Sequence, residues 1–172
     1  FEFDLLLAEL QAIEEQYPEL KTLDSPTQKV GSDINKGFLQ KKHPYPMLSL
    51  SNSYSKEEIE AFIVRISKSL DSPATFVCEP KFDGTSISLH YHNGTLTEAI
   101  TRGDGEKGDD VLQNILTIPS IPKKIKTDIP FLVVRGEIIM PRNVFEELNA
   151  ERVENGENPF ANPRNAAAGT LK

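Results

Sequence analysis

A lysine stands between two carboxylates in the stretch CEPKFDGTSISLHYHNG, residues 78–94. Side chains on an extended strand alternate between its two faces, so Glu79, Lys81 and Asp83 would share one face if this segment were a strand. A buried row of charges is costly, and this face should therefore meet water or a ligand. The pattern leaves two interpretations open: a solvated strand edge with an ion pair, or a reactive site around Lys81.

A lysine attacks other groups through its neutral amine. Two carboxylates on the same face favour the protonated form instead, which opposes that chemistry. The conflict disappears if something else occupies the carboxylates, such as a magnesium ion or a sugar hydroxyl. Lys81 is therefore either part of a passive ion pair or part of a site that a metal ion and a ligand complete.

Further polar residues lie on elements that could converge on the same face of a sheet. Arg102 follows a predicted hairpin, Arg135 and Glu137 share one face of a predicted strand, and Ser49 and Leu50 lie in PMLSLSN. Each of these patterns is weak evidence for a site when taken alone, because an R-G-D triplet is usually a turn and an R-x-E pair is usually a surface ion pair. The sequence has no G-x-x-x-x-G-K-S/T loop and no G-x-G-x-x-G, so any nucleotide site uses another scaffold.

The periodicity predicts an α+β fold in which helices are interspersed with an antiparallel sheet. Asn93-Gly94 between two β-rich runs predicts a type I′ hairpin, and Ser55 with Glu58 predicts a capped helix. The other expected elements are a helix that ends before Pro18, a helix that starts at Pro141, and strands over 47–51, 74–84 and 129–141. Loops are expected over 17–38, 104–110 and 158–172, the second of them followed by a short helix or turn.

Composition sets further limits. The chain has 172 residues, 38% of them hydrophobic and 26% charged, and a formal net charge of −7. This composition is typical of a globular protein. Because it is acidic, the residues that bind DNA should lie mainly outside this chain. Cys78 is the only cysteine, so a disulfide framework is excluded and a reducing compartment such as the cytoplasm fits. We expect Cys78 itself to be a small residue of the core.

No apolar run reaches the length of a membrane span, and no signal-peptide pattern opens the chain. The sequence begins inside a helical pattern without Met and ends at NAAAGTLK. We therefore expect a piece of a longer protein.

The segment KFDG, residues 81–84, matches the K-x-D-G motif of covalent nucleotidyltransferases, which include DNA ligases, RNA ligases and capping enzymes. Its surroundings are more specific, and nearly the whole chain resembles bacterial NAD-dependent DNA ligases. The segments that carry the resemblance, in the order of that family, are YPEL…DSPTQKVG, HPYPMLSLSN, CEPKFDG, TRGDGEKGDDVLQNILTIPSIP, VRGEIIMP, FEELN and FANPRNAAAGTLK.

The resemblance implies the chemistry of Lys81, which would attack the α-phosphate of NAD, become adenylated and release nicotinamide mononucleotide. Asp83 and Gly84 would complete its motif. Glu79 would read the adenine, and Arg102 would contact ribose or phosphate.

The remaining roles follow from the same family pattern. Glu137 would bind the ribose hydroxyls or a magnesium ion, and Ser49 and Leu50 would line the NAD site. Asp4 would hold the nicotinamide mononucleotide half, although Phe3 stands where the family often has Tyr.

The implied organisation is a remnant of an N-terminal helical subdomain with a linker over 1–35, and the first part of an adenylation domain of the ATP-grasp-like nucleotidyltransferase type over 36–172. The family continues with further strands and with OB-fold, zinc-finger, helix-hairpin-helix and BRCT regions, so zinc is expected only outside this chain. The implied function is sealing of nicks in duplex DNA with NAD, in replication and repair.

Two alternatives remain open. An ATP-dependent ligase or capping enzyme shares K-x-D-G but not the NAD-type flanking sequence. The other is a non-catalytic fragment that binds nucleotide. We expect this chain alone to be inactive in overall ligation and to bind DNA weakly.

Overall fold

The computed structural model describes residues 2–22, 25–28, 37–70 and 72–172, with side chains from residue 5 onward. It confirms a mixed fold of helices and antiparallel strands. The elements in chain order are α1 Glu2–Gln16, η1 Pro18–Leu20, η2 Pro26–Gln28, β1 Gln40–Lys42, α2 Lys56–Ser69, β2 Thr85–His92, β3 Thr95–Thr101, β4 Lys107–Asp109, α3 Leu112–Ile115, β5 Phe131–Ile138, α4 Arg142–Glu154 and α5 Pro163–Leu171. Residues 1–47 with 83–172 form one compact unit, and residues 48–82 form a second.

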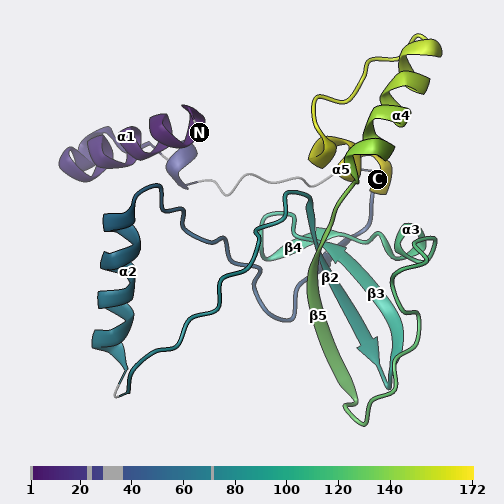
Figure 1. The fold of residues 1–172 in the computed structure, drawn as a ribbon, viewed down its shortest axis with the longest axis horizontal. Coiled ribbons are helices and arrows are strands. Elements are labelled where there is room, and N and C mark those ends of the chain that lie inside the picture. Colours follow the sequence, from purple (N-terminus) through teal and green to yellow (C-terminus); the bar gives the residue numbers. More distant parts are fainter. Residues whose placement is uncertain (1, 23–24, 29–36, 71) are drawn as a thin grey trace. The chain divides into compact units, whose positions relative to one another are not determined.

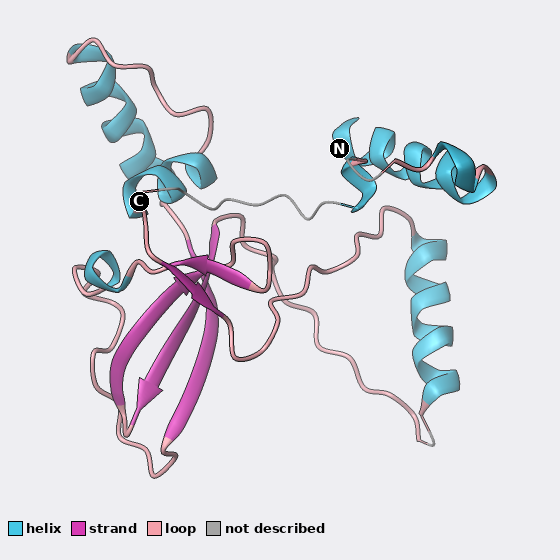
Figure 2. Ribbon diagram, turned by 180° about the vertical axis from the view of Figure 1, so that it is seen from behind, coloured by secondary structure: helices cyan, strands magenta, loops and turns pink. Residues whose placement is uncertain are grey.

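The centre of the first unit is an antiparallel sheet with the strand order β3-β2-β5 (Figure 1). Figure 2 shows the three strands side by side from behind, in magenta. The β2–β3 turn confirms the predicted hairpin, because Asn93 has φ of 48° and Gly94 has φ of 75°. Both angles are positive, as a type I′ turn requires, and Asn and Gly tolerate them best.

One face of this sheet forms the core. Ile87, Leu89 and Tyr91 alternate along β2 and are buried, as expected for a strand with one apolar face. The cluster also includes Leu96, Ala99, Val111, Ile115 and Leu171. The core therefore connects the hairpin to α3 and to the end of α5.

The opposite face of β2 is polar. On β2 it carries Ser86, Ser88, His90 and His92, which pair with Glu137, Arg135, Val133 and Phe131 of β5. The two faces of β5 are therefore those that the alternation in its sequence predicted.

A second, two-stranded sheet pairs β1 with β4 and was not predicted. Its strands read QKK and KGD, which carry no β-type pattern. Gly108 is required there, because a Cβ on it would lie 1.8 Å from the carbonyl oxygen of Thr101. This sheet brings the segment after Lys42 against the turn that follows β3.

The predicted helix boundaries are largely confirmed. α1 ends at Gln16, before Pro18, and α4 follows Pro141. Ser55 Oγ accepts the Glu58 amide of α2 at 3.2 Å, as in a capping box. Glu58 returns the contact to the Tyr54 amide, at 2.6 Å, rather than to Ser55.

Two predicted strands and one predicted core residue were wrong. Residues 47–51 and 74–84 form no strand, and Cys78 is exposed rather than in the core. A strand needs a partner for its amides and carbonyls, and no described strand pairs with these segments.

Residues 158–172 are not all loop, because α5 occupies 163–171. Asn162 Oδ1 accepts the amide of Asn165 at 2.8 Å, and Pro163 stands at the first helical position. Both features favour a helix start, and three alanines follow. In the described part of the chain, no helix combines the length and apolar character that a membrane crossing needs.

Candidate functional site

Three strands bring sequence-predicted residues to one end of the main sheet. Ser86 at the start of β2 lies opposite Glu137 of β5 and donates its hydroxyl to Glu137 Oε2 at 2.8 Å. On the other side, the carbonyl of Ser86 accepts the backbone amide of Arg102 at 3.2 Å. Arg102 and Glu137 therefore flank the same residue, Ser86.

The K-x-D-G motif enters the sheet at this end. A Cβ on Gly84 would lie 2.2 Å from the carbonyl oxygen of Ile138 and 3.0 Å from Cγ of Glu137. Only glycine lets the chain pass so close to β5. Asp83, one residue earlier, is thereby held beside the Glu137 end of the sheet.

Asp83 has a partner that the sequence did not reveal. Arg164 Nη1 lies 3.3 Å from Asp83 Oδ1. Both side chains are more than half exposed, so the pair is weak in energy. Arg164 lies in the first turn of α5, and recognising Asn162-Pro163 as a helix start could have placed it.

Arg135, the other member of the predicted R-x-E pair, does not bind Glu137. Its Nη2 donates to the carbonyl of Tyr45 at 2.6 Å. Tyr45, Phe131, Val133 and Arg135 line an open cavity of about 470 Å³ beside β5. Arg135 therefore ties the segment after β1 to the sheet.

The remaining predicted residues belong to the second unit or to α1. Ser49, Leu50, Glu79 and Lys81 belong to the second unit and are exposed. Lys81 precedes Asp83 by two residues in the chain. Asp4 lies in α1, but its side chain is outside the described residues.

Arg102 begins a tight turn that several internal hydrogen bonds stabilise. Asp104 Oδ1 accepts the amides of Glu106 and Lys107 at 3.0 and 2.9 Å. These backbone hydrogen bonds, that of Lys107 first, hold the pKa of Asp104 below its ordinary value. Gly103 and Gly105 have φ of 59° and 94°, which suits glycine. The turn thus leaves the sheet in a defined direction.

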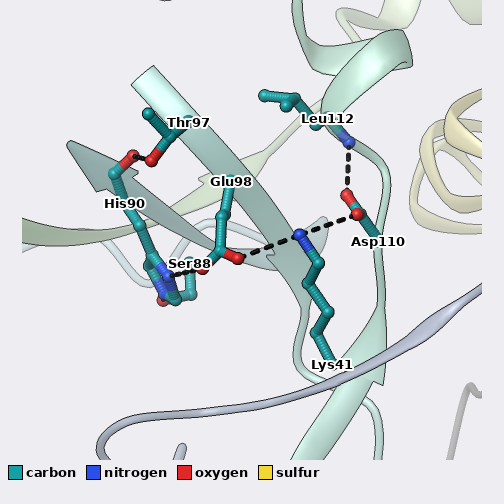
Figure 3. A network of polar contacts seen from close by, with 7 residues as sticks. All are labelled: Lys41, Ser88, His90, Thr97, Glu98, Asp110 and Leu112. Atoms are coloured by element: carbon teal, nitrogen blue, oxygen red, sulfur yellow. Dashed lines mark hydrogen bonds and ion pairs between the residues drawn. The ribbon is translucent and has the colours of Figure 1, made fainter. Parts of the chain in front are cut away.

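A polar network lies on β1, β2 and β3 (Figure 3). His90 Nδ1 lies 2.8 Å from Glu98 Oε2, and His90 Nε2 lies 3.0 Å from Ser88 Oγ. The order Ser–His–Glu resembles a hydrolase triad, but Ser88 and His90 are each only 1% exposed. No substrate can reach them, so the network is structural.

The same network attaches β1 to the sheet. Lys41 Nζ lies 2.9 Å from Glu98 Oε1 and 3.0 Å from Asp110 Oδ2 (Figure 3). The hydrogen bond to Glu98 is the main cause that raises the pKa of Lys41, and the same bond lowers the pKa of Glu98. No local pattern indicates this contact, because Lys41 and Glu98 are 57 residues apart in the chain.

Comparison with known proteins decides between the nucleotidyltransferase classes. Residues 35–172 match the family model for the NAD-dependent DNA ligase adenylation domain, and residues 1–31 match that for the DNA ligase-like, N-terminal NAD+-binding domain. The chain belongs to the NAD-dependent DNA ligase family. This confirms the family that the KFDG segment and its surroundings indicated.

Proteins named DNA ligase align over nearly all of this chain. The relative from Bacteroides fragilis is 56% identical over 99% of this chain. Those from Christiangramia forsetii and Petrotoga mobilis are 53% and 51% identical over 100% and 99% of it. Each alignment covers 26% of the relative, so the chain spans about a quarter of the length of the curated relatives that it matches.

Proposed function

We propose that this chain is the part of an NAD-dependent DNA ligase that takes up the adenylyl group. The carrying observation is the KFDG motif in a chain of this family, with Asp83, Arg102 and Glu137 gathered at one end of the sheet. The complete protein would use the adenylyl group to seal nicks in duplex DNA during replication and repair. That role would place it in the cytoplasm.

The proposed first step is an attack by the neutral Nζ of Lys81 on the α-phosphorus of NAD. A nitrogen–phosphorus bond forms, the phosphorus–oxygen bond to the other half breaks, and nicotinamide mononucleotide leaves with the electron pair. The amine loses one proton. Such transfers depend on positioning and on neutralisation of the phosphate charge.

The other predicted site residues would divide the contacts with the substrate among them. Glu79 would read the adenine, and Ser49 and Leu50 would line the pocket. Arg102, which leaves the sheet beside Ser86, would contact ribose or phosphate. Asp83 would complete the motif, next to Arg164.

Glu137 is the proposed contact for the ribose hydroxyls or for magnesium. Its Oε2 accepts the hydroxyl of Ser86, and the side chain is exposed. The described residues contain no cluster of three or more metal-ligating side chains. Magnesium, however, commonly uses one or two carboxylates with substrate phosphates and water, so a single carboxylate fits it. Bound there, it would neutralise phosphate charge.

We also propose a division of labour along the chain. Residues 1–35, with Asp4, would hold the nicotinamide mononucleotide half, and residues 36–172 would hold the adenylate. Nicked DNA and zinc would bind mainly to parts of the ligase outside this chain. Overall ligation would need those parts.

The test is the replacement Lys81→Arg in the full-length ligase. Arginine keeps the charge but stays protonated, so it cannot supply a neutral amine. Incubation with NAD should add one adenylyl group to the unaltered protein, seen by intact mass, and none to the variant. Lys68→Arg, on exposed α2, is the matched control and should be adenylated normally.

The same assay separates the alternatives. Adenylation by ATP instead of NAD would indicate the ATP-dependent class. An adenylated Lys81→Arg variant would show that another residue is the nucleophile.

A further inference from the structure

His43 makes a set of contacts that the proposed reaction does not use. It follows β1 directly, and its side chain is 4% exposed. Its Nε2 lies 3.1 Å from the carbonyl oxygen of Thr101 and 3.1 Å from that of Arg102. Both neighbours are acceptors, so Nε2 carries the proton and donates to them.

The backbone around His43 holds the same turn. The amide of His43 donates to the carbonyl of Glu106 at 2.8 Å, and that of Met47 donates to Gly105 at 2.8 Å. Residues 43–47 therefore hydrogen-bond the turn after β3 at two places: where it begins, at Thr101 and Arg102, and farther along, at Gly105 and Glu106.

His43 itself is firmly placed. Lys41, two residues earlier, is held by Glu98 and Asp110 (Figure 3), and β1 pairs with β4. Its Nδ1 is buried and has no hydrogen-bond partner among the described residues. A buried polar atom without a partner is costly. The two hydrogen bonds that Nε2 donates offset this cost.

The Arg102 backbone is where these contacts converge. Its amide donates to Ser86, at the Glu137 end of the sheet, and its carbonyl accepts both from the Gly105 amide, at 3.0 Å, and from His43. With both ends of the residue fixed, the direction in which its side chain leaves the turn is fixed as well.

We propose that His43 is a positioning residue for Arg102: its Nε2–H holds the carbonyls of Thr101 and Arg102 and so aims the Arg102 guanidinium at the nucleotide. This rests on the proposed function of the site. His43 does not touch the substrate and would act only through Arg102.

The experiment compares two replacements in the full-length ligase. His43→Gln keeps an N–H donor near the position of Nε2, whereas His43→Met keeps the bulk and removes the donor. Misplacement of a binding group by about 1 Å can cost about 100-fold in rate, so His43→Met should slow single-turnover adenylation by roughly 10- to 100-fold. His43→Gln should recover most of that loss. His92→Met, at the other end of β2, is the control and should change little.

A double-mutant cycle with Arg102→Ala distinguishes positioning from general stability. Once the guanidinium is gone, His43→Met should have no further effect on the adenylation rate. An equal loss from His43→Met in both backgrounds, or no recovery by His43→Gln, would overturn the proposal.

Failure of the proposed function would be visible separately, as absence of adenylation in the unaltered ligase with NAD. Amide hydrogen exchange at Arg102 and Gly105 then tests the positioning role of His43 without any need for adenylation. Faster exchange in His43→Met than in His43→Gln supports it, and equal exchange overturns it.

Discussion

The pairing of Asp83 with Arg164 changes how the carboxylates around Lys81 are understood. The sequence alone left two interpretations open: a passive ion pair, or a site in which a metal ion and a ligand occupy the carboxylates. The structure gives Asp83 a cation from α5, at 3.3 Å. Asp83 therefore has a counter-ion other than the lysine, and because residues 74–84 form no strand, the structure does not set the two acids and Lys81 on one strand face.

Residues in local motifs can be named as site candidates from the sequence, whereas residues whose contacts depend on the fold cannot. Lys81, Asp83, Arg102 and Glu137 lie in recognisable local patterns. His43 acts on a carbonyl 58 residues away, and Arg164 pairs with an acid 81 residues away. No local pattern encodes such distances.

The Lys41–Glu98 pair should give the fold a dependence on pH at both extremes. Contact with Lys41 lowers the pKa of Glu98 below 4.5, so its stabilisation is present above that value and is lost as the pH falls through the folded-state pKa. The pKa of Lys41 is raised above 10.5, so its contribution is present below that value and is lost as the pH rises through the folded-state pKa.

Thermal unfolding across the pH range checks this. Glu98→Gln should lower the melting temperature near neutral pH and flatten its fall on the acid side. Glu146→Gln, on the exposed surface of α4, is the control. A Glu98→Gln variant whose melting curve still follows the unaltered protein at every pH would contradict the assignment.

Elements with strong local signals were predicted well, and elements that depend on distant partners were not. The Asn93-Gly94 hairpin and α2 have turn or cap residues of their own, and a proline follows α1 and precedes α4. β1 and β4 are three residues each and exist only because they pair. Residues 74–84 show the converse, since a β-rich sequence forms no strand where no described strand pairs with it.

The cap of α5 gives a prediction at this scale. Asn162→Ala removes the side-chain acceptor for the Asn165 amide and should cost about 1 kcal/mol of unfolding free energy. α5 carries Leu171 into the core, so the loss should reach the whole first unit. Denaturant titration measures it. Asn162→Ser, which keeps an acceptor, should be nearly neutral, and equal losses in both variants would rule out the cap.

β5 gives a second prediction for an element. Among the described strands it pairs only with β2, so its other edge offers unpaired amides and carbonyls. Such edges promote association between chains. The 172-residue chain alone should therefore gain mass with concentration in light scattering.

A charge on the edge strand should suppress that association. Val134 of β5 is 40% exposed, and Val153 of α4 is 60% exposed. Val134→Lys should keep the chain monomeric, whereas Val153→Lys should not. If both replacements act alike, the association does not run through β5.

At the scale of the whole molecule, two family models divide the chain, and the division suggests separable tasks. The match over residues 1–31 is to an NAD+-binding domain, and that over 35–172 is to an adenylation domain. Sealing of a nick that is already adenylated no longer involves nicotinamide mononucleotide. Asp4→Ala in the full-length ligase should therefore cripple the reaction with NAD and spare the sealing of pre-adenylated DNA.

Rates of the two reactions, measured side by side with Lys21→Ala as a control on an exposed loop, test that separation. An equal loss in both would mean that Asp4 supports the helix instead, as an acid in the first turn often does.

The charge of the whole chain gives the last prediction. Proteins that hold DNA neutralise its phosphates with lysine and arginine, and even non-specific binding at physiological salt is roughly 10⁻⁴ to 10⁻⁶ M. This chain has 26 acidic and 19 basic residues. It should repel the phosphate backbone on average, so the chain alone should show no appreciable binding of nicked duplex at physiological salt and should not seal it. Fluorescence anisotropy with labelled nicked DNA, with the full-length ligase as the positive control, measures this, and tight binding by the chain alone would show that this part of the ligase carries its own DNA surface.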